Sequence, residues 1–469
     1  MNTTTFHTDL LIIGAGPTGL AAAQLALEHG YEVDLVDDNF QSGGQIWRGG
    51  AQTQHDKRAQ LLAKMLAQSS RLRCHFQSKV VHLNGSINQF SAVLDHVQNT
   101  TSTSSRIMAK RVIIATGARE LLLPFPGWTL PGVTGAGGLQ ALAKSGYPVK
   151  GKRVVVAGTG PLLLAVAASL VERGAIVTHI VEQTSFSKLK RFAFKLFATP
   201  SKLWQALGLA WKLRQQQYWS TAFVLEALGG KRLERVVIQH AGERKTIECD
   251  FLACGFGLVP NLELAAGIGC KFDTTKLPEE SFMRSPLTLS PRLESSIAGV
   301  FCAGETTGVG GVDLALVEGR LAASSAVLSL KQAQTDNTAP NETEAQQQLA
   351  NTIVEAKADR NKWQTFASNL ESTFALREEL TQLCRDDTIV CRCEDVRFQE
   401  LKIHPDWRSA KLHTRCGMGP CQGRVCGTAN RLLFGWERDL GRMPLSASPI
   451  ESLLAIVESK EVTSNQEIT

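Results

Sequence analysis

Short apolar runs that end at glycine recur along the first two thirds of the chain. The first of them opens residues 9–37, which read DLLIIGAGPTGLAAAQLALEHGYEVDLVD. An apolar run bounded by turn residues is typical of a buried strand, and the alanine-rich stretch behind it is typical of a helix. The pattern predicts a strand, a turn, a helix and a second strand in that order.

Three glycines and one acid give this unit its candidate chemistry. Gly14 is placed for a tight turn, Gly16 for close approach of the backbone to a pyrophosphate, and Gly19 for packing of the helix on the strand. The helix N-terminus adds a positive dipole. Asp37 ends the second strand, where it can bind a ribose hydroxyl. Together these residues predict a dinucleotide site.

A second unit of the same kind covers residues 152–182, KRVVVAGTGPLLLAVAASLVERGAIVTHIVE. Gly158, Gly160 and Glu182 stand in the corresponding places, but the third glycine is replaced by Leu163. A branched side chain there is expected to push the helix from the strand or to fill the space of a cofactor. Two interpretations stay open: bound NAD(P), or a nucleotide-type fold kept as scaffold.

The two units in series resemble the flavoprotein oxidoreductases built from paired Rossmann domains, over about residues 8–330. In that family the first fold binds FAD. The segments RVIIATGARE, GVFCAGETTG and SGGQIWRG match its flavin-contacting parts, although the family more often has aspartate at the position of the glutamate. The resemblance adds six residues to the expected FAD site: Gly44, Gln45, Thr116, Gly117, Gly304 and Glu305. Because SGGQIWRG holds no redox cysteine pair, a thioredoxin-reductase-like activity is not expected.

Composition narrows the classes of protein that fit. The 469 residues carry a formal net charge of +6 and are 43% hydrophobic, which is typical of a globular protein of about two to four domains. Basic residues are mostly dispersed among acids, so no nucleic-acid function is expected. The N-terminal segment has no basic leader before its short apolar run, so neither a signal peptide nor a membrane span is expected. We therefore expect a cytoplasmic protein.

The chain has 11 cysteines, an odd number, which in the cytoplasm favours reduced, buried or metal-bound thiols over disulfides. Several gather near the end: Cys391, Cys393, Cys416, Cys421 and Cys426. Thiolates at such spacing bind zinc or an iron-sulfur cluster, and the single residue between the first two is shorter than in common zinc knuckles. Spacing alone does not choose two further ligands, because four residues separate each successive pair of the last three cysteines.

The sequences CRCEDV and TRCGMGPCQGRVC resemble the small helical [2Fe-2S] domain of the bacterioferritin-associated ferredoxin type. Cys416 stands where that pattern usually has a small residue that is not a ligand. The resemblance implies four cluster ligands: Cys391, Cys393, Cys421 and Cys426.

Residues 187–214 are basic and aromatic and contain no acid. Such a stretch can lie on an anionic membrane surface, dock to a partner subunit, or be a helical insertion that packs on its own domain. The first alternative allows association with the inner face of the membrane. Its basic residues are Lys188, Lys190, Arg191, Lys195, Lys202, Lys212 and Arg214, interleaved with Phe192, Phe194, Phe197, Trp204 and Trp211.

The predicted fold class is α/β, with paired Rossmann-like domains and a small C-terminal helical [2Fe-2S] domain. Residues 331–350 are polar and predict a flexible linker. The expected segments are 1–120 for the first part of the FAD-binding domain, 121–255 for the second nucleotide-binding-like domain, 256–330 for the return to the FAD-binding domain, 331–350 for the linker, and 351–469 for the region with the cluster domain.

This order of parts resembles the alpha-type subunits of heteromeric amine dehydrogenases, such as opine oxidase, hydrogen cyanide synthase and D-hydroxyproline dehydrogenase. The resemblance implies a flavin-dependent oxidoreductase subunit that transfers electrons while an amino-acid-oxidase-type flavoprotein partner oxidises the C–N bond of an amine, imino acid or opine. It also allows FMN between subunits and an adenine nucleotide in the second fold. No catalytic residue is predicted, because no convincing acid–base pair or nucleophile stands out.

Two other functions remain open from the sequence. One is a stand-alone NAD(P)H-dependent reductase, which requires nicotinamide in the second fold. The other is a non-enzymatic assembly or iron-sensing protein that holds nucleotide and cluster only as ligands. The flavin-contacting segments around Gln45 and Glu305 speak against the second alternative.

Overall fold

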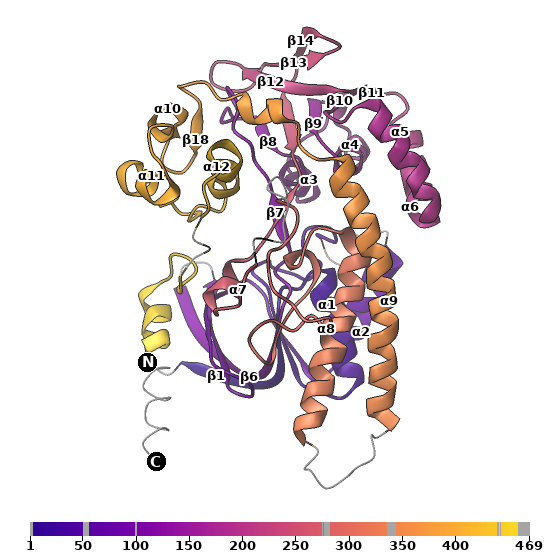
Figure 1. The fold of residues 1–469 in the computed structure, drawn as a ribbon, viewed down its shortest axis with the longest axis vertical. Coiled ribbons are helices and arrows are strands. Elements are labelled where there is room, and N and C mark those ends of the chain that lie inside the picture. Colours follow the sequence, from indigo (N-terminus) through magenta and orange to yellow (C-terminus); the bar gives the residue numbers. More distant parts are fainter. Residues whose placement is uncertain are drawn as a thin grey trace. The chain divides into compact units, whose positions relative to one another are not determined.

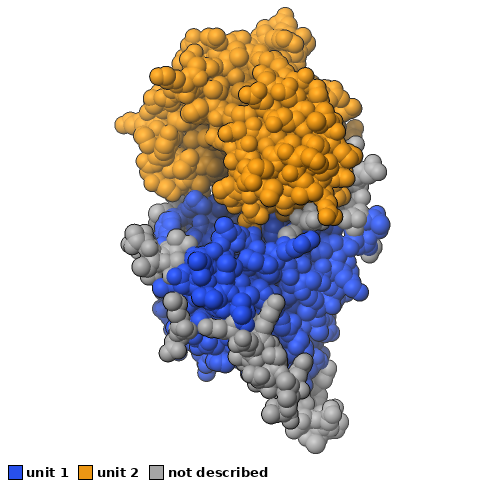
Figure 2. Space-filling view, turned by 90° about the vertical axis from the view of Figure 1, so that its left-hand side faces the viewer, with its two compact units in different colours: residues 1–118, 260–367, 440–469 blue, residues 119–259, 368–439 orange. Residues whose placement is uncertain are grey.

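The computed structural model describes residues 3–49, 56–98, 101–273, 275, 282–334, 344–438, 440 and 442–457. The chain forms two compact units, coloured separately in Figure 2. Unit 1 comprises residues 1–118, 260–367 and 440–469, and unit 2 comprises residues 119–259 and 368–439. Each unit is therefore built from segments far apart in the sequence.

Unit 1 is built on a seven-stranded sheet. Five strands run parallel in the order β3-β2-β1-β6-β17, and β6 also pairs antiparallel with β5, which pairs with β4. The strands are β1 (Thr4–Ile13), β2 (Val33–Val36), β3 (Leu72–His75), β4 (Ser78–Asn84), β5 (Phe90–Gln98), β6 (Thr101–Ile114) and β17 (Val300–Cys302).

The two faces of β1 belong to two hydrophobic cores because successive side chains of a strand point to opposite sides. Leu10 and Ile12 pack in one core with residues of α1, α8 and α9, whereas Leu11 and Ile13 pack in the other with residues of β5 and β6. Figure 1 shows α8 and α9 as two long neighbouring helices. The helices of unit 1 include α1 (Pro17–Glu28), α2 (Lys57–Ala67), α7 (Glu263–Gly267), η4 (Gly304–Thr306) and α8 (Gly311–Gln334), together with most of α9 (Glu344–Thr373).

Unit 2 contains a five-stranded parallel sheet in the order β11-β10-β9-β15-β8 and a three-stranded antiparallel sheet, β12-β13-β14. The strands of these two sheets are β8 (Val133–Gly135), β9 (Arg153–Gly158), β10 (Ile176–Glu182), β11 (Gln217–Ser220), β12 (Ala222–Leu228), β13 (Arg235–His240), β14 (Glu243–Glu248) and β15 (Phe251–Gly255). The chain enters unit 2 at β7 (Ala118–Glu120) and returns to unit 1 at β16 (Leu258–Pro260). Its helices include α3 (Ala136–Lys144), α4 (Leu162–Glu172), α5 (Phe186–Lys195), η2 (Leu196–Ala198), α6 (Pro200–Lys212) and η5 (Glu378–Gln382).

The cysteine-rich segment also belongs to unit 2 and has a hydrophobic core of its own, in which Trp407 and Trp436 pack beside three of the cysteines. The indole Nε1 of Trp128 donates to the carbonyl of Ile389 at 2.6 Å, which ties this segment to the rest of the unit. Its elements are β18 (Ile389–Cys391), β19 (Val396–Arg397), α10 (Phe398–Leu401), α11 (Trp407–Thr414) and α12 (Cys426–Phe434).

The predicted α/β fold class with two Rossmann-like sheets and a helical C-terminal region is confirmed. The predicted linker, 331–350, differs from the structure at both ends, because α8 extends to Gln334 and α9 begins at Glu344. Residues 335–343 of that linker lie outside the described residues. Among the described helices, none is long and apolar enough to cross a membrane.

Candidate dinucleotide site and cysteine centre

The turn between β1 and α1 is shaped by Gly14 and Gly19. Gly14 has a φ of 110°, and a Cβ atom there would lie 2.2 Å from the carbonyl oxygen of Ala115. A Cβ at Gly19 would lie 1.8 Å from the carbonyl oxygen of Gly14. Both positions exclude any side chain, so the first turn of α1 sits directly against the strand, as the glycine spacing predicts.

Gly16 is the N-cap of α1, and no side chain caps this helix end. A Cβ at Gly16 would meet only the Cα atom of Gly44, at 3.9 Å. The space above Gly16 is therefore bounded by backbone and lies at the positive end of a helix dipole. This geometry fits a pyrophosphate, whose negative charge backbone amides at a helix N-terminus can bind.

Asp37 lies at the end of β2 and is 8% exposed. Its Oδ2 accepts the amide of Ala15 at 2.6 Å, and its Oδ1 accepts the amide of Asn39 at 2.9 Å. These bonds hold the carboxylate beside the glycine turn, and carboxylate oxygens have further lone pairs for a ribose hydroxyl.

The predicted flavin-contacting segment, SGGQIWRG, also lies beside the glycine turn. The amide of Gly43 donates to the carbonyl of Ala15 at 2.8 Å, and a Cβ at Gly44 would lie 3.0 Å from the Cα of Gly16. Gln45 is exposed, whereas Trp47 is buried. The structure thus brings Gly44 to the glycine turn and leaves the side chain of Gln45 in contact with solvent.

The strand ends at Thr116 and Gly117 meet the return segment. The Thr116 hydroxyl donates to the carbonyl of Asn261 at 3.1 Å, and the Gly117 amide donates to the Thr306 hydroxyl at 3.1 Å. Gly117 has a φ of 66°, and a Cβ there would meet no atom within 4 Å. Open space therefore also lies beside Gly117.

The turn that contains Gly304 and Thr307 is held by a carboxylate that the sequence motifs did not single out. Glu318, on α8, is fully buried and accepts the Gly304 amide at 2.9 Å and the Thr307 hydroxyl at 2.7 Å. Arg360 on α9 donates to its other oxygen at 2.7 Å. An acid inside the apolar helix segment DLALVEGRLAAS indicates a buried carboxylate, but it does not indicate which residues that carboxylate contacts. Burial raises the pKa of Glu305 to about 6.

In the second glycine turn, as in the first, the acid at the end of the next strand accepts a backbone amide of the turn. Glu182 Oε2 accepts the Gly160 amide at 2.8 Å, and burial raises the pKa of this carboxyl. Leu163 is 1% exposed and packs in the core of unit 2. A Cβ at Gly255 would lie 3.0 Å from the Leu163 side chain, so Gly255 makes the room that the missing third glycine would have left.

A segment of the same unit covers this second turn. The Thr159 hydroxyl donates to the carbonyl of Phe374 at 3.2 Å, and the Gln183 side chain donates to the carbonyl of Ala375 at 2.9 Å and accepts the Arg377 amide at 2.9 Å. A Cβ at Gly160 would lie 3.9 Å from the Phe374 ring. Residues 374–377 therefore lie where a nucleotide approaching this loop would have to bind.

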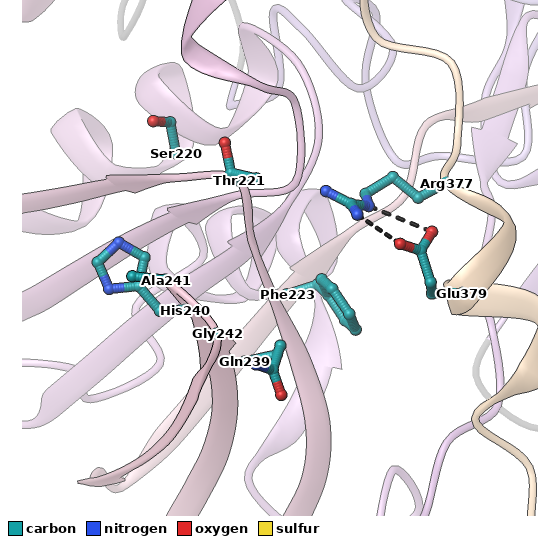
Figure 3. Close-up of a pocket in the computed structure, with 9 residues that line it drawn as sticks. All are labelled: Ser220, Thr221, Phe223, Gln239, His240, Ala241, Gly242, Arg377 and Glu379. Atoms are coloured by element: carbon teal, nitrogen blue, oxygen red, sulfur yellow. Dashed lines mark hydrogen bonds and ion pairs between the residues drawn. The ribbon is translucent and has the colours of Figure 1, made fainter.

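A cavity of about 510 Å³ in unit 2 contains no predicted site residue (Figure 3). Its wall includes the ion pair of Arg377 with Glu379, and the Arg377 guanidinium lies 5.4 Å from the centre of the Phe223 ring. The lining residues are Ser220, Thr221, Phe223, Gln239, His240, Ala241, Gly242, Arg377 and Glu379.

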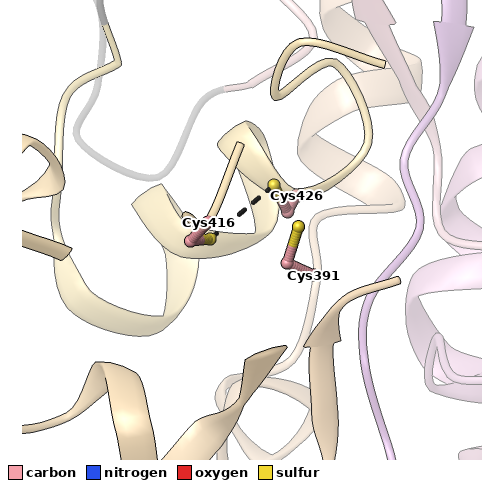
Figure 4. A group of neighbouring side chains, drawn as sticks. All are labelled: Cys391, Cys416 and Cys426. Carbon is pink, nitrogen blue, oxygen red and sulfur yellow. Dashed lines mark hydrogen bonds between the residues drawn. The ribbon is translucent and has the colours of Figure 1, made fainter. Parts of the chain in front are cut away.

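Three cysteines form a buried group with their Sγ atoms all within 4.8 Å of one another (Figure 4). They are Cys391 at the end of β18, Cys416 after α11 and Cys426 at the start of α12. The Cys391 sulfur accepts the Gly417 amide at 3.5 Å, and hydrogen bonds from the two other thiols lower the pKa of Cys391. Three sulfur donors at this spacing fit one tetrahedral metal.

The two other predicted ligands lie nearer the surface. Cys393 is exposed and Cys421 is partly buried, and their thiols interact with each other. A Cβ at Gly419 would lie 2.4 Å from the Cβ of Cys393, so glycine is required there. The structure thus groups Cys391 and Cys426 with Cys416, which was not a predicted ligand, and pairs the two other predicted ligands, Cys393 and Cys421, with each other.

A glycine turn without a side-chain cap, a carboxylate held beside it and open backbone space are typical of a dinucleotide-binding oxidoreductase fold. The profile of the family described as pyridine nucleotide-disulphide oxidoreductase matches residues 8–324, so the chain belongs to this family. The chain is a flavin oxidoreductase, as its sequence predicts.

Similarity to individual proteins extends over nearly the whole chain. It is 29% identical over 450 residues to the A subunit of opine oxidase from Agrobacterium tumefaciens (strain Ach5), covering 92% of this chain and 86% of that protein. It is 28% identical over 477 residues to hydrogen cyanide synthase subunit HcnB of Pseudomonas aeruginosa, covering 94% and 97%. The predicted resemblance to subunits of heteromeric amine-oxidising enzymes is confirmed.

Among solved structures, the chain resembles L-proline dehydrogenase from P. horikoshii with a TM-score of 0.68 at 17% identity, covering 97% of this chain and 80% of that chain. It also resembles thioredoxin reductase of T. acidophilum, with a TM-score of 0.51 at 21% identity, over 70% of this chain and 99% of that chain. These likenesses support the paired-domain fold.

Proposed function

We propose that this chain is the FAD- and [2Fe-2S]-carrying subunit of a heteromeric enzyme that oxidises the C–N bond of an amine, imino acid or opine. The observation that carries the proposal is the combination, in one chain, of an uncapped glycine turn at Gly16 with a buried thiol group around Cys391. Whole-chain similarity to the opine oxidase protein and to HcnB supports it.

Each cofactor has residues that fit it. Gly16 and Gly117 border open space, which the pyrophosphate and the flavin would need. Asp37 is fixed beside the glycine turn, where it would bind a ribose hydroxyl. Glu305 belongs to the short helix η4, together with Gly304. FAD exchanges two electrons with a substrate or partner, and a [2Fe-2S] cluster passes single electrons onward. We assign the cluster ligands as two pairs, Cys391 with Cys426 and Cys393 with Cys421.

The substrate would be selected by a second, amino-acid-oxidase-type flavoprotein subunit. A stand-alone NAD(P)H reductase is disfavoured, because Phe374 contacts the second glycine turn, Ala375 contacts the adjacent Gln183, and Leu163 packs in the core beneath the turn. In this proposal the second fold serves as scaffold and electron donation comes from the partner.

Anaerobic spectroscopy of the purified chain tests the proposal. We expect bound flavin and iron, and bleaching of both chromophores by dithionite. NADH and NADPH should not bleach them, and an amine should bleach them only after the partner subunit is added. Bleaching by a reduced nicotinamide alone would make the chain a stand-alone reductase. A chain that binds iron but no flavin would instead support the assembly or sensing function.

A further inference from the structure

Helix α6 of unit 2 contains no fully buried residue. Trp204, Leu207 and Trp211 are 73%, 52% and 69% exposed. These residues are spaced at i, i+3 and i+7, so they form one stripe along the helix. An apolar stripe with two tryptophans on the outside of a helix is costly in water and points to a surface that is covered in the working protein.

The preceding elements extend the stripe. Phe194 of α5 and Phe197 of η2 are 63% and 66% exposed, and their ring centres lie 6.5 Å apart. The opposite side of the same elements is anchored, because Phe192, Leu196 and Leu213 are buried. Figure 1 shows α5 and α6 at one edge of unit 2. The exposed aromatics are therefore held outward by packing on the inner side.

The charged residues of the segment 187–214 all have one sign. Residues 187–214 contain seven lysines and arginines and no acid. Lys188, Lys190 and Arg191 are exposed. Lys212 pairs with Glu172 at the margin, and Arg214 stacks on the Trp211 ring at 4.4 Å. The cations and the exposed aromatic residues thus belong to the same segment, and Arg214 lies directly on the aromatic stripe.

The combination of lysine-rich and aromatic composition distinguishes a lipid membrane from a protein partner. Protein interfaces are enriched in aromatic residues and arginine but depleted in lysine. Helices that lie in the membrane interface combine lysine and arginine with tryptophan, phenylalanine and leucine. With five lysines among the seven cations, residues 187–214 have the composition of the second class. Anionic lipids also supply the opposite charge.

We propose that α5, η2 and α6 form a docking surface for a lipid bilayer that contains anionic lipid. The aromatic side chains would enter the boundary between headgroups and acyl chains, and the lysines would contact the headgroups. Such docking would keep an electron-transferring protein beside an acceptor dissolved in the bilayer. The inference rests on the α5–α6 surface and holds independently of the cofactors.

Sedimentation of the full chain with vesicles tests this proposal. We expect binding to phosphatidylcholine vesicles that contain about one third phosphatidylglycerol, at least tenfold weaker binding to pure phosphatidylcholine, and strong weakening by added salt. The double variant Trp204→Ser/Trp211→Ser should lose at least tenfold in binding to the anionic vesicles. Ile403→Ser, another exposed apolar position at 75%, is the matched control and should bind like the wild type.

Two charge-reversal variants test whether the positive charge of this surface contributes to vesicle binding. Lys190→Glu should weaken vesicle binding several-fold, whereas Arg244→Glu, which reverses one exposed charge on β14, should not. Flavin content and thermal unfolding report whether each variant is folded. Equal binding of all variants, or no binding to anionic vesicles, would overturn the proposal. Loss of partner-subunit binding in the tryptophan variant, without any vesicle binding, would assign this surface to a protein interface.

Discussion

The Sγ atoms of Cys416 and Cys426 lie 3.9 Å apart, and the Asn430 side chain donates to the Cys416 sulfur at 3.4 Å. The resemblance that predicted the ligands leaves Cys416 out, yet its thiol is fully buried against the first ligand pair. A thiol in this position is either an unused neighbour that hydrogen-bonds a ligand sulfur or a competing ligand. Substitutions distinguish the two roles.

The first prediction concerns these thiols. Cys421→Ser and Cys426→Ser should each remove the visible absorbance and the iron of the cluster, because each removes one thiolate of a pair. Cys416→Ser should retain iron and absorbance but shift the reduction potential, since a hydrogen bond to a ligand sulfur would change. Iron content, absorbance and a redox titration measure the effects. Cluster loss in Cys416→Ser, with retention in Cys393→Ser, would move the ligand set to the buried three cysteines.

The second prediction concerns the glycine turn. Gly16→Val should abolish flavin binding, because its side chain would occupy the open space beside the N-terminus of α1, where a pyrophosphate fits. The protein should still fold, since only Gly44 lies near a Cβ at this position. Gly208→Ala on α6 is a suitable control, because a Cβ there meets no atom within 4 Å. The flavin content of each purified variant measures the effect. A Gly16→Val protein with full flavin would refute the FAD assignment.

Much of the site was predictable because its signals are local. The spacing of Gly14, Gly16 and Gly19 encodes a turn that any such strand and helix must make, and Asp37 follows at the end of the next strand. Contacts between distant segments left no such signal. Nothing in the spacing shows that Glu318 holds the Gly304 turn, or that residues 374–377 cover the second glycine turn.

The bounds of the predicted linker were inaccurate for the same reason, because they depend on contacts between distant residues. Polar composition around residues 331–350 favours a linker, but α8 and α9 continue into it from either side because their apolar residues, such as Val327 and Leu349, pack in one core. The cysteine spacing was ambiguous for a related reason. Four residues separate each successive pair of the last three cysteines, so spacing alone does not predict that Cys391 lies beside Cys426. The fold of α11 and α12 determines which sulfur atoms converge.

The third prediction concerns the segment over the second glycine turn. Phe374 is 8% exposed and its ring packs edge-on against Phe192 at 5.2 Å. Phe374→Ala should lower the free energy of unfolding by about 3 kcal/mol, through lost burial and the cavity it leaves. Phe186→Ala, at a position 69% exposed, should change it by less than about 0.5 kcal/mol. Urea unfolding measures both variants.

The same segment predicts how the protein responds to nicotinamide. Titration calorimetry of the wild type with NADH should give no saturable binding, because the Thr159 hydroxyl and the Gln183 side chain are already bonded to residues 374 and 375. Saturable binding by the wild type would show that the segment moves aside, and would revive the stand-alone reductase.

The fourth prediction is a pH dependence of stability that comes from Glu305. Burial raises the pKa of its carboxyl from 4.5 to about 6, and the Gly311 amide opposes this effect. The folded state therefore holds the proton more tightly than the unfolded chain. The stabilisation is fully present below about pH 4.5 and is lost as the pH rises through about 6, by about 2 kcal/mol in total.

Urea unfolding of flavin-free protein between pH 4 and pH 8 tests this prediction, with Glu305→Gln as the comparison. The difference in unfolding free energy between wild type and variant should change across the window from about pH 4.5 to 6 and stay constant above it, because the glutamine side chain of the variant cannot titrate. Subtracting the variant removes the contributions of other carboxyls, which both proteins share. A difference that is independent of pH would mean that Glu305 titrates at its ordinary pKa, as a solvated carboxylate would.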